Sequence, residues 1–167
     1  MLQVLAKLGA VPKTPPRWLN DSERQAWMPF VGLLLKLPPA LDSAMRQRTG
    51  LSHFEYVVMA AMSESADRTR PMSELAGVVN ASLSRLSHVV ARIEQRGWVR
   101  RSTSPDSARV TLATLTDEGL AVVVATAPEH VEAVRALVID VLEPAQLKQL
   151  ATISGQLLGN LEDSQPG

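Results

Sequence analysis

Six arginines lie close together in the centre of the chain. Residues 82–109 contain these six arginines and only two acids, so the segment carries a net charge of +4. Residues 110–167 carry a charge of −6, although the whole chain is neutral. Guanidinium groups pair well with phosphates and with the edge of guanine, so this pattern favours a nucleic acid as the partner. A solvated basic face without any partner would give the same charges, and charge alone leaves both interpretations open.

The same segment has polar side chains suited to the major groove of duplex DNA. Ser82 is a typical helix N-cap, and the pattern predicts a helix from Leu83 to about Arg96 that stops at Gly97. Short hydroxyl side chains allow a helix to approach base edges and phosphates closely. Arg85 and Arg92 are seven residues apart and therefore lie on the same helical face, whereas Glu94 lies on the opposite side. The predicted contacts on this helix are Ser82, Ser84, Arg85, Ser87, His88 and Arg92.

The neighbouring segments predict a helix-turn-helix with a wing. Ser52 and Glu55 form a capping-box pattern that begins one helix, and a short helix follows at Ser73–Val79. Asn80 and Ala81 leave room only for a tight turn before Ser82. Two β-like runs, 98–102 and 110–115, then form a hairpin around a turn-rich tip, whereas residues 63–70 read as a polar loop. The predicted wing contacts are Arg100, Arg101 and Arg109.

Apolar spacing predicts how these elements pack. On the arginine-bearing helix, the apolar positions are Leu83, Leu86, Val90 and Ile93, with Val89 beside them. A first helix is predicted from about Asp21, capped by Asn20 and Glu23, with a break or marked kink near Pro38. Thr116 caps a later helix that Pro128 should bend, and Pro144 begins the last one. The expected fold class is mainly α with a small β-hairpin wing.

Other classes of function find little support. The chain has no cysteine, which excludes disulfides and thiolate chemistry. The three histidines show no metal-ligand spacing, and no nucleophile motif or phosphate loop is present, so we predict no enzyme, no metal and no cofactor. No apolar run is long enough to span a membrane, and the first ten residues do not read as a signal peptide. We therefore expect a cytoplasmic protein with no membrane partner.

The run SLSRLSHVVARIEQRGWVRR, followed by R-VTLATLTDEG, resembles the MarR family of winged-helix transcriptional regulators. The resemblance covers roughly residues 20–162 and is most specific over 72–119. It implies a two-fold dimer held by the first and last helices, a pseudo-palindromic operator, and often a small phenolic or lipophilic ligand that releases DNA. The recognition-helix residues named above match the family, and Arg109 matches its wing arginine. The family commonly has an Asp two residues before that arginine, where this chain has Ser107.

Dimerisation also follows from the apolar segments near both chain ends, which a small basic lobe could not cover. The expected organisation is an N-terminal arm (1–19), an N-terminal dimerisation region (20–50), a DNA-binding lobe (51–116), C-terminal dimerisation helices (117–162) and a tail (163–167).

A ligand pocket is the second candidate site. The side chains that could form it are Trp27, Phe30, His53, Tyr56 and Met59. His53 and Tyr56 would bring polar tips to an apolar wall, suited to an aromatic acid or another lipophilic effector. The favoured interpretation of the same residues is that they are ordinary core and dimer-interface side chains.

The sequence thus predicts a homodimeric regulator, repressor rather than activator, that binds double-stranded DNA. The alternative is a winged-helix module that binds a protein partner and not DNA.

Overall fold

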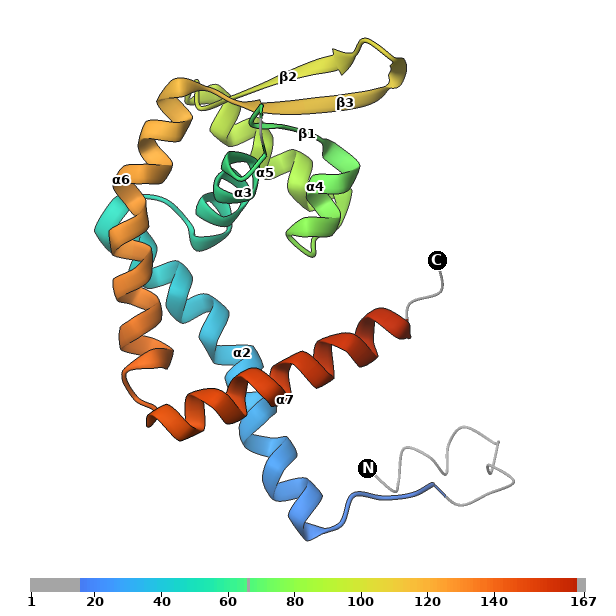
Figure 1. Cartoon of the computed structure of the whole chain (residues 1–167), viewed down its shortest axis with the longest axis vertical. Coiled ribbons are helices and arrows are strands. Elements are labelled where there is room, and N and C mark those ends of the chain that lie inside the picture. Colours follow the sequence, from blue (N-terminus) through green and yellow to red (C-terminus); the bar gives the residue numbers. More distant parts are fainter. Residues whose placement is uncertain (1–15, 66, 165–167) are drawn as a thin grey trace, which may run out of the picture. The chain divides into compact units, whose positions relative to one another are not determined.

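The computed structural model describes residues 16–65 and 67–164, and it is mainly helical with one small sheet (Figure 1). Residues 16–20 have no regular structure, and the rest of the predicted N-terminal arm lies outside the described residues. The elements are α2 (Asp21–Thr49), α3 (His53–Ser63), β1 (Thr69–Pro71), α4 (Met72–Val78), α5 (Leu83–Gln95), β2 (Val99–Ser104), β3 (Ser107–Leu115), α6 (Asp117–Val134), the π-helical segment η1 (Arg135–Ile139) and α7 (Pro144–Asp163). The chain divides into two compact units, one up to Lys36 and one from Leu37 onward.

Local capping sets most helix ends, as predicted. The Asn20 N–H donates to the Glu23 carboxylate at 2.8 Å, and the Glu23 N–H donates back to the Asn20 side chain at 2.9 Å. Thr116 caps α6 by accepting a hydrogen bond from the Gly119 N–H at 3.0 Å. Gly97 follows α5 with a φ of 79°, a conformation that glycine adopts without strain. These ends depend on side chains within four residues, which explains why the sequence predicts them.

The predicted break in the helix near Pro38 is wrong, while the alternative, a marked kink there, stays a prediction. α2 is one helix of 29 residues that runs through all three of its prolines. A proline inside a helix removes one backbone hydrogen bond and crowds the preceding turn. Pro38 and Pro39 are both exposed, so water can hydrate the carbonyl groups that lose their partners. α6 likewise continues through Pro128 and then passes into η1.

The sheet has three strands rather than the two predicted. All pairs are antiparallel, in the order β1-β3-β2. β1 comes from the end of the predicted polar loop, where Thr69 pairs with Thr114 and the two hydroxyl groups hydrogen-bond at 2.9 Å. Three residues are too few to show a strand period, so the partner strand decides this element. β2 and β3 form the hairpin that extends beyond the helices in Figure 1.

The core of the larger unit joins α3, α4, α5, the sheet and the start of α6. α5 contributes four buried side chains to it: Leu86, Val89, Val90 and Ile93. The predicted apolar face included Leu83, but the structure leaves 53% of this side chain exposed. Leu83 is the first residue of α5, at the edge of the apolar stripe, and lies beyond the reach of the core.

Two close approaches fix α6 against the hairpin. The Thr116 hydroxyl donates to the Gly97 carbonyl at 2.8 Å. At Gly119, an added Cβ would overlap the carbonyl oxygen of Trp98. Glycine is therefore required at this position by contact and not by a turn conformation.

Candidate nucleic-acid interface

A tight turn between α4 and α5 presents the first turn of α5 at the surface. Asn80 adopts a left-handed conformation with a φ of 48°. The Ala81 N–H then donates to the Ala76 carbonyl at 2.9 Å. Ser82 caps α5 by accepting a hydrogen bond from the Arg85 N–H at 3.2 Å. A helix that enters a DNA groove needs such an accessible N-terminal end.

The exposed face of α5 combines small and basic side chains. Ser84, Arg85, His88 and Arg92 are exposed, and Ser87 is half-buried. At about 100° per residue, Ser84 and His88 lie opposite the buried stripe, while the two arginines lie to one side. Small side chains at the centre and guanidinium groups on the flank suit close approach to bases and phosphates.

Arg92 is held by an acid from another helix. Its Nε donates to the Glu55 carboxylate at 3.3 Å, and only 3% of the Glu55 side chain is exposed. Burial opposes ionisation of Glu55, but hydrogen bonds from Ser52 and the pairing with Arg92 outweigh it and hold the pKa of Glu55 below its ordinary value. Sequence reasoning assigned Glu55 only to the cap and missed this contact, because 37 residues separate the pair.

Arg85 is held by an aromatic ring. Its guanidinium lies 4.3 Å from the ring centroid of Phe54, within the range of a cation–π contact. Phe54 is half-buried on α3 and fixes the starting position of an otherwise flexible side chain. The sequence offered no sign of this pair.

The hairpin is braced against the end of α5 through Glu94. The Arg101 N–H donates to one Glu94 oxygen at 2.8 Å, and the Arg101 guanidinium pairs with the other oxygen at 2.6 Å. These bonds with Arg101 hold the pKa of Glu94 below its ordinary value. β2 is an edge strand, so its outward N–H groups are available for such a contact. Arg101 therefore has a structural partner in addition to its predicted role.

The two other predicted wing arginines are exposed. Arg100 lies on β2 beside the Arg68–Asp117 ion pair, whose atoms are 2.8 Å apart. Arg109 lies near the hairpin tip, where its N–H donates to the Ser107 hydroxyl at 3.4 Å. Among the described residues, the Arg109 side chain forms no ion pair, so its guanidinium is available to a ligand.

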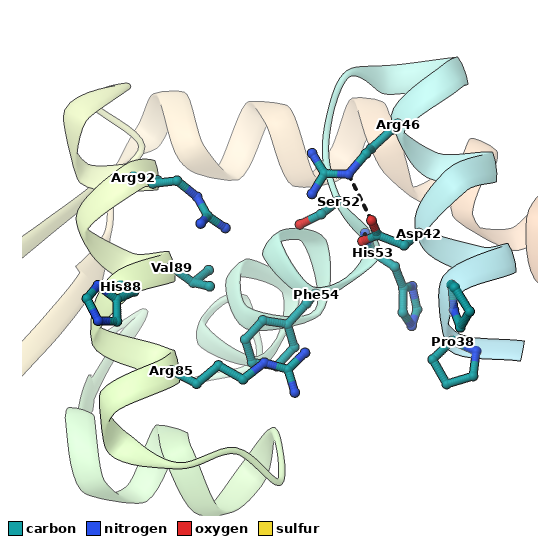
Figure 2. Close-up of a pocket in the computed structure, with 11 residues that line it drawn as sticks. Pro38, Asp42, Arg46, Ser52, His53, Phe54, Arg85, His88, Val89 and Arg92 are labelled. Atoms are coloured by element: carbon teal, nitrogen blue, oxygen red, sulfur yellow. Dashed lines mark hydrogen bonds and ion pairs between the residues drawn. The ribbon is translucent and has the colours of Figure 1, made fainter. Parts of the chain in front are cut away.

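A cavity of about 610 Å³ lies between the C-terminal part of α2, α3 and α5. Figure 2 shows Arg85 lying across the Phe54 ring and Val89 and Arg92 directed from α5 toward α3. The charged residues that line the cavity are Asp42, Arg46, Arg85 and Arg92. The cavity walls also include His53 and His88. Arg46 pairs with Asp42 at 2.8 Å. Because Arg46 and Arg92 are each paired with a carboxylate, Arg85 is the lining guanidinium that favours an anionic occupant.

The structure places the predicted ligand-binding side chains in two units of the chain, so a single pocket formed by all five stays a prediction. His53 lines the cavity, whereas Met59 is fully buried in the core. Trp27 and Phe30 belong to the unit that ends at Lys36, and their ring centroids are 6.1 Å apart. His53 and Tyr56 lie against His130 of α6, with their ring centroids 5.3 Å and 4.6 Å from the centroid of His130.

Burial shifts the titration of this aromatic cluster. It lowers the pKa of both His53 and His130 and raises the pKa of Tyr56. Nδ1 of His53 is buried and has no hydrogen-bond partner among the described residues. Burial therefore favours the neutral form of both stacked imidazoles.

The described residues contain no cluster of three or more His, Asp or Glu side chains that could hold a metal ion. Within the same part of the chain, every helix is too short or too polar to cross a membrane.

Comparisons with known proteins agree on one family. The model of the MarR family matches residues 53–111. Sco3205, a MarR family transcriptional regulator from Streptomyces coelicolor solved in complex with DNA, is 40% identical, with a TM-score of 0.84 over 91% of this chain and 96% of that one. AbsC, a MarR family regulator from the same organism, is 34% identical, with a TM-score of 0.80 over 89% of this chain and all of that one. The HTH-type transcriptional regulator PecS of Dickeya dadantii is 28% identical over 152 residues, covering 87% of this chain and 89% of PecS.

Proposed function

Because the chain belongs to the MarR family of transcriptional regulators, we propose that it binds duplex DNA sequence-specifically through α5 and the β2–β3 hairpin. The observation that carries this proposal is the exposed face of α5, with Ser84 and His88 at its centre and guanidinium groups beside them. DNA needs both features, since phosphate contacts supply affinity and base contacts supply specificity.

The proposed contacts fall into two groups. The proposed contacts of the recognition helix are Ser82, Ser84, Arg85, Ser87 and His88. Those of the hairpin are Arg100 and Arg109, which are exposed and form no ion pair with another described residue. Arg92 and Arg101 also face this surface, but each is already paired with a glutamate. We propose that these two arginines contribute mainly by fixing the helix and the hairpin in register, with weaker contacts to DNA.

A homodimer is the proposed binding unit. α7 has no fully buried side chain, and it exposes large apolar groups at Ile153, Leu157, Leu158 and Leu161. An apolar stripe of this length is unfavourable in water and favours burial against a second copy. Two-fold symmetry would place two recognition helices roughly 34 Å apart on a pseudo-palindromic operator. We propose that the dimer acts in the cytoplasm as a repressor.

We also propose release of DNA by a small aromatic acid that binds the cavity between α2, α3 and α5. Phe54 offers a flat apolar surface, and Arg85 beside it offers a guanidinium for a carboxylate. Of the five residues predicted for such a ligand, His53 is the one that lines this cavity. Since Arg85 lines the cavity and belongs to the DNA face, ligand and DNA would compete for it.

Fluorescence anisotropy on duplex DNA tests the central proposal. The labelled duplex comes from upstream of the protein's own gene, and a scrambled duplex of equal length is the control. Tight, steeply salt-dependent binding to the first and weak binding to the second is the expected result. Equal and salt-insensitive binding to both would support the alternative, a winged-helix module with a protein partner.

The effector is tested with benzoate against neutral benzamide in the same assay. Competition for Arg85 predicts that the apparent dissociation constant for DNA rises in proportion to benzoate concentration without a plateau. Benzamide, which lacks the charge, should have little effect. A plateau would instead indicate that ligand and DNA bind together, and equal effects of the two probes would contradict the anionic site.

A further inference from the structure

Leu83 occupies an unusual place for a large apolar side chain. It is the first residue of α5, directly after the capping Ser82, and 53% of its surface is exposed. The four other large apolar side chains that follow on this helix are all buried in the core. Packing of the lobe therefore does not require leucine at this position.

Leu83 lines a small hollow whose other walls are mostly polar. With Met72, Ser87, Arg101 and Thr111, it lines a hollow of about 160 Å³ between α4, α5 and the hairpin. Ser87 lies one turn further along the same side of α5. The apolar part of this hollow is thus enclosed by hydroxyl groups and by a guanidinium that Glu94 holds in place.

A thymine base fits this combination of groups. Thymine differs from the other three bases in the major groove by its C5-methyl group, which apolar side chains recognise by contact. The neighbouring cation and hydroxyl groups complement the phosphates and base edges around that methyl. The N-terminal residues of a recognition helix are those that reach the base edges.

We propose that Leu83 is a specificity-determining residue that selects thymine at one position of each operator half-site by burying its C5-methyl group. The inference rests on the proposed DNA binding through α5. It assigns a base-reading role to a residue that the sequence pattern placed in the core.

The test begins with selection of duplexes from a random library by the wild-type protein. Each thymine of the selected half-site is then replaced singly by deoxyuridine, which removes only the methyl group. For one position we expect wild-type binding to weaken roughly three- to five-fold per half-site, the size expected for one buried methyl group. Leu83→Ala should bind the thymine and deoxyuridine duplexes equally at that position.

Val78→Ala is the matched control, because Val78 is exposed to a similar degree but lies on α4. This variant should keep the wild-type sensitivity to deoxyuridine. A thermal unfolding curve of Leu83→Ala close to that of wild type will show that the variant folds, and it is expected because more than half of Leu83 is exposed.

The outcomes of this test distinguish failure of the proposed DNA binding from failure of the proposed role of Leu83. If no duplex is enriched and the wild-type protein binds none, the proposed function and this inference both fail. If selection succeeds but every deoxyuridine duplex binds like its parent, only the role of Leu83 is overturned. The same holds if Leu83→Ala remains as sensitive to deoxyuridine as the wild type, or if the selected site contains no thymine.

Discussion

The Glu55 carboxylate joins the start of α3 to the last turn of α5. One of its oxygens accepts hydrogen bonds from the Ser52 N–H and hydroxyl at 2.9 and 2.8 Å, and the other accepts from Arg92 at 3.3 Å. A single buried acid thus completes a helix cap and holds an arginine of the proposed recognition helix. This contact adds to the apolar core that α3 and α5 share.

Replacing Glu55 should lower the free energy of unfolding. Glu55→Ala removes the cap contacts and leaves Arg92 without its partner, so we expect the free energy of unfolding to fall by about 1–3 kcal/mol. Glu55→Gln keeps a capping acceptor and should lose less stability. Urea denaturation gives these values, with Glu162→Gln at the exposed end of α7 as the control. A Glu55→Ala protein as stable as the wild type would contradict the structural role of this acid.

The stacked pair His53 and His130 predicts a pH dependence of stability. Burial lowers the pKa of both groups in the folded protein, so the unfolded chain binds more protons once the pH falls below about 6.5. The free energy of unfolding should therefore decrease as the pH is lowered from about 6.5 through the folded pKa values. The contribution of the Glu55 carboxylate, whose folded pKa is also lowered, is lost only at more acidic pH, below its ordinary value near 4.5.

Urea denaturation between pH 5 and 8 measures this dependence. His130→Gln should flatten the profile between pH 5 and 6.5, and His88→Gln on the exposed face of α5 should leave it as in the wild type. The negative charge of Asp42 opposes the lowering of the His53 pKa, so His130 is the better position for this test. An unchanged profile in His130→Gln would show that the pair does not control acid stability.

Gly119 predicts a contrast between two glycines in helices. Gly119→Ala would force a Cβ against the Trp98 carbonyl oxygen and the Leu115 side chain, and should destabilise the protein by about 1–3 kcal/mol. At Gly77 of α4 an added Cβ meets no atom within 4 Å, so Gly77→Ala should be neutral or stabilise by up to about 1 kcal/mol. Thermal unfolding of both variants checks the prediction, which equal melting temperatures would refute.

The arginines of the proposed interface should differ in their effect on salt dependence. Arg109→Gln and Arg85→Gln remove cations that have no carboxylate partner among the described residues. Loss of one phosphate-binding cation should reduce the slope of log affinity against log salt by about 0.9. Arg92→Gln and Arg101→Gln should alter the slope less, because Glu55 and Glu94 already balance these charges.

Anisotropy titrations over a salt series give these slopes, with Lys148→Gln of α7 as the control. Wild-type slopes and affinities for all four arginine variants would show that DNA does not bind this face.

Features that depend on neighbours along the chain could be predicted from the sequence alone. The caps at Ser52, Ser82 and Thr116 need only residues within one helical turn, and the buried stripe of α5 from Leu86 to Ile93 follows from helical spacing. The family motif over the same segment therefore led to the right fold class and the right kind of regulator. For the same reason the candidate DNA-facing residues of α5 could be named from helical spacing and residue type.

Features that depend on distant partners arise only in the folded chain. β1 exists because β3 pairs with it, across 45 residues at Thr69 and Thr114. Packing of α3 against α5 brings Glu55 to Arg92 and Phe54 to Arg85, and it leaves Leu83 outside the core. α2 continues through Pro38 because its exposed side can hydrate the freed carbonyl groups. The spacing of residues along the chain does not predict such contacts, since they form only when separate elements pack together and exclude water.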